Sequence, residues 1–118
     1  DSFTEMERLS AAGERYDVVV ADPPAFVKSK KDFSRGSRAY RKMTRLAASL
    51  VAPEGILFVA SCSHNVAPDV FTDRVKQGVA DVGRSGRILR SAGAGPDHPV
   101  HHALPETAYL KSLTLQLD

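Results

Sequence analysis

Apolar and polar positions near the start of the chain predict a short helix followed by a strand. Ser2 and Glu5 have the spacing of a capping box, and apolar residues recur at helical intervals over residues 3–12. Residues 16–21 (YDVVVA) form a β-branched run that predicts a buried strand. A Pro-Pro pair follows closely and cannot continue a β-ladder, so a loop begins at the carboxyl end of this strand.

The middle of the chain combines a polar loop with an amphipathic helix. Residues 25–36 are polar and basic and have no sustained period, which indicates a loop. From about Ser37, apolar residues fall on one face of a helix that we expect Pro53 and Gly55 to end. The apolar residues of this face are Tyr40, Met43, Ala47, Leu50 and Val51.

The remaining pattern predicts a strand, a helix and two further strands. Residues 55–62 (GILFVASC) are a continuous apolar run typical of a buried strand, and Pro68 suits the first turn of the next helix. Residues 87–91 alternate as a short strand, residues 92–105 indicate a loop, and residues 109–117 alternate again as a terminal strand. The apolar face of the helix comprises Val70, Phe71, Val75, Val79 and Val82.

This order of elements is typical of an α/β domain with layered helices and a mostly parallel sheet. A length of 118 residues, with 42% hydrophobic and 25% charged residues, suits one globular domain and leaves no room for a second. Nucleotide-cofactor folds of this class hold their ligand at a glycine-rich turn after a first strand, and this sequence has no G-x-G-x-x-G. We expect such a turn to lie upstream of Asp1.

Composition indicates the cellular location of the protein and limits the chemistry of its cysteine. No apolar run approaches the roughly 20 residues that span a bilayer, and the first residues lack the features of a secretory signal. We therefore expect a cytoplasmic protein with no membrane partner. The single cysteine, Cys62, excludes an intrachain disulfide and a zinc site built on several thiolates, so it is either a buried thiol or a reactive one.

Two motifs follow predicted parallel strands, at the ends where open α/β sheets bind ligands. Residues 22–26 (DPPAF) follow the first strand, and residues 61–63 (SCS) end the second. If the two strands are neighbours, both motifs face one pocket. The first motif resembles motif IV of class I methyltransferases that act on nucleobases. The second resembles the motif that carries the nucleophile in RNA cytosine-C5 methyltransferases.

Further segments extend the resemblance over nearly the whole chain. Ser-Lys follows the first motif, Arg-x-Tyr enters the next helix, and residues 97–99 (DHP) and 109–111 (YLK) come late. Together they are similar to the bacterial 23S rRNA cytosine-C5 methyltransferase I family. The resemblance implies that residues 1–118 are the carboxyl-terminal part of a catalytic domain with a Rossmann-like, mostly parallel sheet and a final antiparallel strand. It also implies S-adenosyl-L-methionine (SAM) as cofactor and ribosomal RNA as partner.

The resemblance assigns catalytic roles to Cys62 and Asp22. Cys62 would add to carbon 6 of cytosine as a thiolate, and nearby positive charge would stabilise that thiolate. Asp22 would accept a hydrogen bond from the exocyclic amine or hold a protonated ring nitrogen. From the residues alone, a small buried thiol is the simpler interpretation of Cys62, and an ordinary turn residue is the alternative for Asp22.

Binding residues follow from the same resemblance. Asp1 matches the acidic residue near the adenine amine, in an Asp-x-Phe stretch that includes Phe3. The expected cofactor-binding residues are Asp1, Phe3, Asp22 and Pro23. The expected RNA-binding residues are Pro24, Phe26, Lys28, Lys30, Lys31, Arg38 and His98.

A basic segment, residues 28–45, carries eight basic side chains against the single acid Asp32. A solvated helix face is the simple interpretation of this pattern. Its place directly after residues 22–26 favours contact with RNA phosphates, which give affinity without sequence readout. Phe26, Phe33 and Tyr40 are candidates for stacking on a flipped base, although Tyr40 is also spaced as a core residue.

The sequence departs from better known RNA cytosine methyltransferases in one respect. Those enzymes carry a second cysteine inside motif IV, whereas residues 24–26 supply none. The base that removes the carbon-5 proton is therefore unassigned, with His64 as a candidate and an exposed loop histidine as the simpler interpretation. We expect no metal, because the histidines of residues 98–102 lack convergent Cys, Asp or Glu partners.

Two other functions stay open. A methyltransferase acting on a base amine or a guanine nitrogen also uses D-P-P-aromatic motifs and needs no cysteine. A non-catalytic RNA-binding α/β module would use only the basic loop. The class I strand order implied by the resemblance also makes residues 16–21 an edge strand in this chain, so we expect the isolated chain to self-associate, most simply as a dimer.

Overall fold

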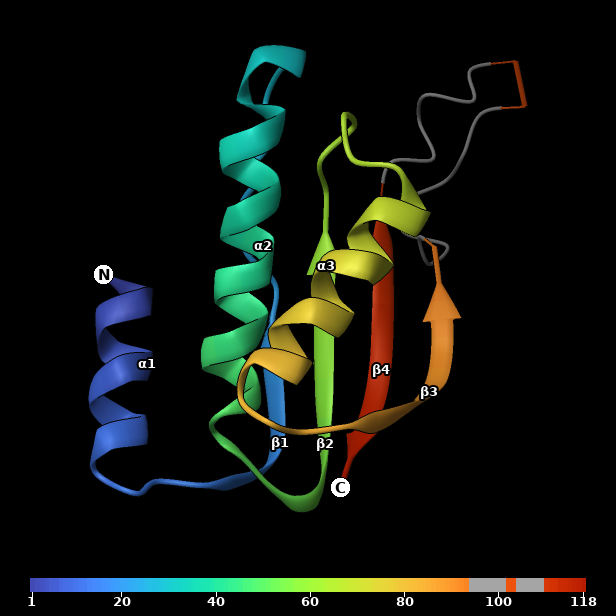
Figure 1. Ribbon diagram of the computed structural model, residues 1–118. Helices are drawn as coiled ribbons and strands as arrows, with labels where there is room; N and C mark the ends of the chain where they lie inside the picture. The colour runs from blue at the N-terminus through green and yellow to red at the C-terminus, as the bar shows by residue number, and fades with distance from the viewer. Residues whose placement is uncertain (94–101, 104–109) are drawn as a thin grey trace.

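The computed structural model describes residues 1–93, 102–103 and 110–118. Helices and strands alternate along the chain, as the residue pattern predicts, and a 3-10 turn precedes the second helix (Figure 1). Among the described residues, no helix is long and apolar enough to cross a membrane. The elements are α1 (Ser2–Ala11), β1 (Tyr16–Ala21), η1 (Lys30–Asp32), α2 (Phe33–Ala48), β2 (Val51–Ser61), α3 (Pro68–Asp81), β3 (Gly86–Ala92) and β4 (Lys111–Leu117).

The four strands form one mixed sheet in the order β1-β2-β4-β3. Strands β1 and β2 pair in parallel, and β4 runs antiparallel to both β2 and β3. The expected α/β class and the final antiparallel strand are therefore confirmed. Because β4 lies between β2 and β3, the last strand of the chain is internal to the sheet rather than at its edge.

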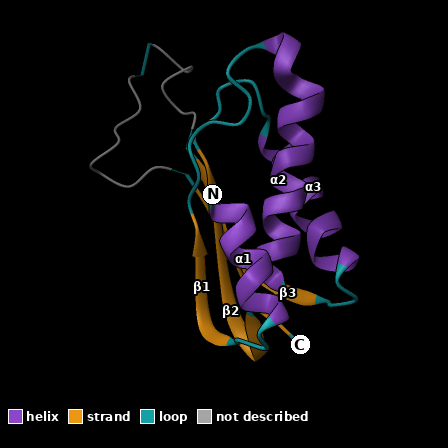
Figure 2. Cartoon of the chain, turned by 90° about the vertical axis from the view of Figure 1, so that its left-hand side faces the viewer, coloured by secondary structure: helices purple, strands orange, loops and turns teal. Residues whose placement is uncertain are grey.

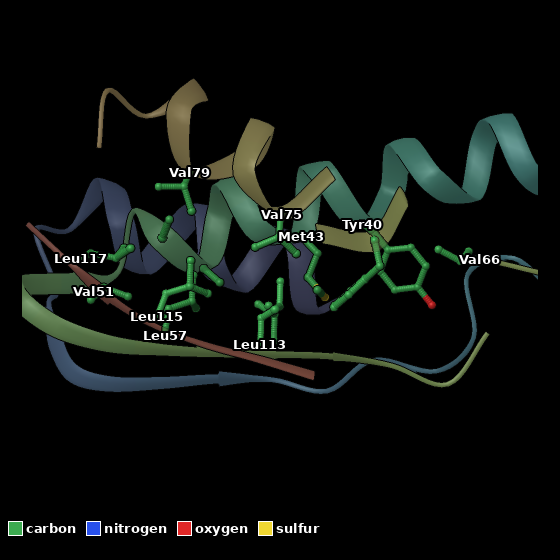
Figure 3. Close-up of a cluster of buried hydrophobic side chains, with 14 of the residues drawn as sticks. Tyr40, Met43, Val51, Leu57, Val66, Val75, Val79, Leu113, Leu115 and Leu117 are labelled. Carbon is green, nitrogen blue, oxygen red and sulfur yellow. The ribbon is translucent and has the colours of Figure 1, made fainter. Parts of the chain in front are cut away.

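All three described helices lie on one face of the sheet, and the core fills the space between the layers (Figure 2). Tyr40 and Met43 reach down from α2, and Leu57, Leu113 and Leu115 reach up from the strands (Figure 3). Each of these side chains is buried. Removing apolar surface from water stabilises the fold by about 25 cal/mol per Å², and this gain in free energy drives the packing.

The opposite face of β1 is open. Val18 is 61% exposed and Val20 is 64% exposed, while Val19 between them is half-buried against the core. The prediction of a buried strand over residues 16–21 is therefore wrong for this chain, because no described element covers its second face. The expectation that this strand is an edge is confirmed.

Two predicted boundaries are wrong in the region of the second helix. The helix begins at Phe33 rather than Ser37, because the 3-10 turn Lys30–Asp32 leads directly into it. It ends at Ala48, and Pro53 and Gly55 lie inside β2, which starts at Val51. Thus Val51 begins a strand instead of completing the helix face.

Candidate functional site

The two sequence motifs lie at the same edge of the sheet, because β1 and β2 are parallel neighbours. Ala21 pairs with Val59 near the carboxyl ends of both strands. Residues 22–26 leave β1 at this edge, and Cys62 follows β2 directly. The strands carrying the two motifs are therefore neighbours, which is the condition under which we expect both motifs to face one pocket.

A hollow of about 430 Å³ lies beside the first motif. It brings together residues of α1, β1, the loop after β1 and α2. Cys62 is not part of its lining, so the expectation that both motifs face one pocket is wrong for this hollow. The hollow and the cysteine are distinct features at one end of the sheet. The lining residues are Asp1, Ser2, Phe3, Met6, Val19, Val20, Ala21, Asp22, Pro23, Pro24, Phe26, Met43 and Ala47.

The hollow gathers six residues that the sequence marked for cofactor or base binding. Asp22 and Pro24 are exposed, and Phe3, Pro23 and Phe26 are half-buried. The sixth residue, Asp1, is also the amino-terminal cap of α1. Its carboxylate accepts hydrogen bonds from the Phe3 backbone N–H at 3.0 Å and from the Thr4 hydroxyl at 3.4 Å.

An aromatic row runs from the wall of the hollow into the core. The rings of Phe3 and Phe26 lie 6.0 Å apart, and those of Phe26 and Tyr40 lie 4.8 Å apart, both edge-on. The Lys42 ammonium lies 5.2 Å from the centre of the Phe3 ring. Tyr40 is only 1% exposed, so the prediction that it stacks on a base is wrong, because its ring belongs to the core.

The Tyr40 hydroxyl connects the two motifs through hydrogen bonds. It accepts from the Phe26 backbone N–H at 3.3 Å and from the Ser61 hydroxyl at 2.8 Å. It also lies 2.6 Å from the Ser63 hydroxyl, which accepts from the Val27 backbone N–H at 3.3 Å. The loop after β1 and the turn after β2 are therefore fixed against each other inside the protein.

The direction of each bond in this network follows from the number of available protons. A tyrosine hydroxyl has one proton and two lone pairs. Since Phe26 and Ser61 both donate to Tyr40, the Tyr40 proton points at Ser63. The Ser61 hydroxyl in turn accepts from the Ser63 backbone N–H at 3.2 Å. Each of these three buried hydroxyl oxygens has a hydrogen-bond partner, which favours a single, rigid arrangement.

A tight contact with α2 also holds the loop after β1. A side chain at Gly36 would overlap the Phe26 carbonyl oxygen and the Val27 side chain. Gly36 is buried in the first turns of α2. The helix therefore approaches the loop more closely than any residue with a Cβ would allow.

Cys62 is a free, half-buried thiol between the buried Ser61 and Ser63. Lys111 of β4 is 8% exposed, and its ammonium donates to the Ser63 carbonyl oxygen at 2.9 Å. Burial lowers the pKa of Lys111 from its ordinary value, and the charge of Cys62 opposes that shift. His64 is exposed in the same turn.

The basic segment does not form one uniform surface. Arg41 makes a two-pronged ion pair with Asp81 of α3, at 2.8 and 2.7 Å. Arg35 lies 3.5 Å from Asp32. The expected RNA-binding residues Lys28, Lys30, Lys31 and Arg38 are exposed around the amino-terminal end of α2.

The histidine-rich part of the chain lies largely beyond what the structure covers. His98 and His101 fall outside the described residues, as do Asp97 and Pro99. His102 is exposed. Within the described ranges, no three His, Cys, Asp or Glu side chains converge as a metal site would require.

Sequence reasoning missed two parts of this site. Nothing in the local pattern shows that Tyr40 bonds both motifs, because its partners are 14 to 23 residues away. Lys111, by contrast, had a readable signal. Alternate residues of a strand lie on the same face, so Lys111 lies on the same face as Leu113, Leu115 and Leu117. Because this face is buried, the pattern itself places the lysine inward.

Comparison with solved structures defines the class of the fold. A methyltransferase crystallised with SAH matches 98% of this chain with a TM-score of 0.77 and 22% identity, over 30% of its own chain. A SAM-dependent methyltransferase from Streptococcus mutans matches 98% of this chain with a TM-score of 0.76 and 21% identity, over 29% of its own chain. The chain has the fold of part of a Rossmann-like SAM-dependent methyltransferase domain.

Sequence comparison finds relatives of one particular kind. The chain is similar to ribosomal RNA large subunit methyltransferase I of Aeromonas salmonicida, with 36% identity over 116 residues, and of Enterobacter sp., with 34% identity over 117 residues. These matches cover 98% and 99% of this chain. The chain spans 29% and 30% of the length of these relatives. No family model matches the chain.

Proposed function

We propose that this chain is the carboxyl-terminal part of the catalytic domain of a SAM-dependent enzyme that forms 5-methylcytosine in large-subunit ribosomal RNA. Identity of 34–36% to proteins of the large-subunit rRNA methyltransferase I family supports membership of that family and the rRNA substrate. One observation carries the cytosine-C5 chemistry. Tyr40 and Ser63 bond the turn of the single cysteine to the loop that begins with Asp22.

The hollow suits part of the SAM molecule. Its volume of about 430 Å³ is within the usual range of small-molecule sites, and its walls are mostly apolar with carboxylates at Asp1 and Asp22. Asp1 and Phe3 would hold the adenine end, and Asp22 and Pro23 would lie near the reactive end. SAM supplies an electrophilic methyl group when it is bound.

Cys62 provides the nucleophile that this chemistry needs. Carbon 5 of cytosine attacks poorly by itself, so the Cys62 thiolate first adds to carbon 6 and forms an S–C bond. The resulting enamine carries extra electron density on carbon 5, which takes the methyl group. A base then removes the carbon-5 proton, the C5–C6 double bond forms again, and the S–C bond breaks to return the thiolate. The exposed His64 is a candidate for this base.

The remaining site residues position the base and the RNA strand. Asp22 bonds the exocyclic amine or a protonated ring nitrogen of cytosine, which draws electrons from carbon 6. Pro24 and Phe26 provide a rigid apolar wall beside the base. The exposed cations near the start of α2 contact RNA phosphates. Such contacts depend on charge and do not depend on the base sequence. These cations are Lys28, Lys30, Lys31 and Arg38, and His98 is proposed as a further RNA contact.

A covalent trap tests the role of Cys62. RNA that carries 5-fluorocytosine at the target position cannot lose a proton from carbon 5 after methyl transfer, so the S–C6 bond persists. We expect the full-length protein to form a SAM-dependent adduct that migrates slowly on a denaturing gel. Cys62→Ser should abolish the adduct. An enzyme that methylates RNA normally but forms no adduct contradicts the proposed role.

Amine methylation is the second candidate function. It is favoured by one observation, that Cys62 does not line the hollow beside Asp22. An enzyme of this type transfers the methyl group directly to a nitrogen and needs no thiol. Cys62→Ser would then leave methylation unchanged, and nuclease digestion with mass spectrometry would identify an N-methylated nucleoside instead of 5-methylcytosine.

A further inference from the structure

Lys111 occupies a position that a core leucine would normally fill. It pairs with Ser61 across β2 and β4, and it lies in phase with the buried Leu113. With 8% exposure, it is the only buried lysine or arginine among the described residues. Burying an ammonium is costly unless nearby groups compensate for lost water.

Part of this compensation comes from the cysteine turn. The Lys111 ammonium reaches from β4 to the Ser63 carbonyl oxygen at 2.9 Å, directly beside Cys62 in the chain. An ammonium held there places positive charge one residue along the chain from Cys62, where a thiolate would form. Among the described residues, other titratable or charged side chains near the cysteine turn include the buried Tyr40, whose hydroxyl bonds Ser61 and Ser63. Asp22, Lys28 and His64 are exposed to water, which screens charge.

We propose that Lys111 is a positioning residue that acts through Cys62, by holding a buried positive charge that stabilises the Cys62 thiolate. The inference rests on the proposed function, because a thiolate matters only if Cys62 attacks cytosine. The Cys62 proton leaves to solvent water, and Lys111 keeps its own protons throughout. The sulfur lone pair that this exposes then forms the bond to carbon 6.

The electrostatic relation between the two groups is mutual. Cys62 raises the pKa of Lys111 against the larger lowering effect of burial. Opposite charges attract each other, so an ammonium beside a thiol favours the thiolate form in general. Coupling between two sites is reciprocal, so each partner can be measured through the other.

The first test measures the pH dependence of Cys62 alkylation by iodoacetamide in the full-length protein, with the Cys62 peptide followed by mass spectrometry. Lys111→Met removes the charge but keeps an apolar chain of similar length. We expect its half-maximal alkylation at higher pH, and a rate about tenfold lower at pH 7 if the shift is one pH unit. The control is Lys76→Met, at an exposed lysine of α3, which should follow the wild-type profile.

A second measurement covers the case in which Lys111→Met fails to fold, as circular dichroism would show. NMR titration of the Lys111 side chain in Cys62→Ser should give a lower pKa than in the wild type, because the thiolate is gone. An unchanged pKa, or a folded Lys111→Met with a wild-type alkylation profile, overturns the proposal. Neither measurement uses RNA or SAM, so failure here is distinct from failure of the 5-fluorocytosine trap, which tests the proposed function.

Discussion

The Tyr40 hydroxyl lies 2.6 Å from the Ser63 hydroxyl, and this contact joins helix α2 to the turn that carries Cys62. The same oxygen accepts from the Phe26 backbone at 3.3 Å. One buried atom thus fixes the distance between the cysteine and the loop that would hold the base. An enzyme that forms a covalent bond to its substrate depends on such fixed geometry, since small misplacements slow the reaction strongly.

Tyr40→Phe should uncouple the two loops without emptying the core. The ring stays, but the Ser61 hydroxyl and the Phe26 N–H lose their acceptor. A buried group left unsatisfied costs about 1–3 kcal/mol, so urea unfolding should show a loss of that size. We also expect slower formation of the 5-fluorocytosine adduct at saturating RNA. Tyr16→Phe, at a 41% exposed ring, is the control and should change neither value.

Gly36→Ala should harm the protein although alanine favours helices. At an open helical position this change stabilises by about 0.5–1 kcal/mol. At Gly36 the new methyl group would overlap the Phe26 carbonyl and the Val27 side chain. We expect a net loss of about 1–3 kcal/mol by chemical denaturation. Ser34→Ala on the same helix is the control, and a stabilised Gly36→Ala would show that the loop moves aside freely.

Much of the fold could be predicted because its elements are marked by local pattern. The strand of residues 16–21 has the predicted bounds, since a β-branched run and two prolines define it. The start of α2 could not be predicted, because the helix continues from a 3-10 turn of polar residues. These residues have no apolar periodicity that would indicate a helix. Pro53 predicts a helix end because proline cannot continue a helix, yet it lies in β2.

The candidate site also has residues that could be predicted from the sequence and residues that could not. Asp22 and Cys62 were accessible to sequence reasoning because both follow strands and resemble known motifs. The bonds of Tyr40 were not accessible, because they depend on how α2 crosses the end of the sheet. Lys111 was readable in principle, since a charged residue in the inward phase of an alternating strand needs a reason.

Arg38 and Arg41 should respond differently to loss of charge when RNA binding is measured. Arg38 is exposed, whereas Arg41 is held by Asp81 at 2.7 Å. Arg38→Gln in the full-length protein should weaken RNA binding and reduce the slope of log affinity against log salt by about 0.7–1. Arg41→Gln is the matched control with a smaller effect. Fluorescence anisotropy over a range of salt concentrations measures both, and equal slopes for Arg38→Gln and wild type contradict the phosphate contact.

Strand β1, at one of the two edges of the described sheet, bears on how the isolated chain behaves. Strand β1 pairs only with β2 among the described strands, and its outer face exposes Val18 and Val20. No lysine or proline interrupts residues 18–21 to discourage pairing with another strand. An exposed apolar strand with unpaired backbone groups is a template for association.

We therefore predict that the isolated 118-residue chain forms a two-fold dimer through β1 or its adjoining face, and that Val20→Lys prevents it. A lysine on this strand places a charge in the apolar contact. Burying that charge would cost more free energy than the apolar contact contributes. Leu89→Lys is the matched control, because Leu89 is 55% exposed on β3 at the opposite edge of the sheet, and this variant should remain dimeric. Sedimentation equilibrium at micromolar concentrations measures all three chains. A monomeric wild-type chain with strong amide protection over residues 16–21 would show that the edge is stable without a partner strand.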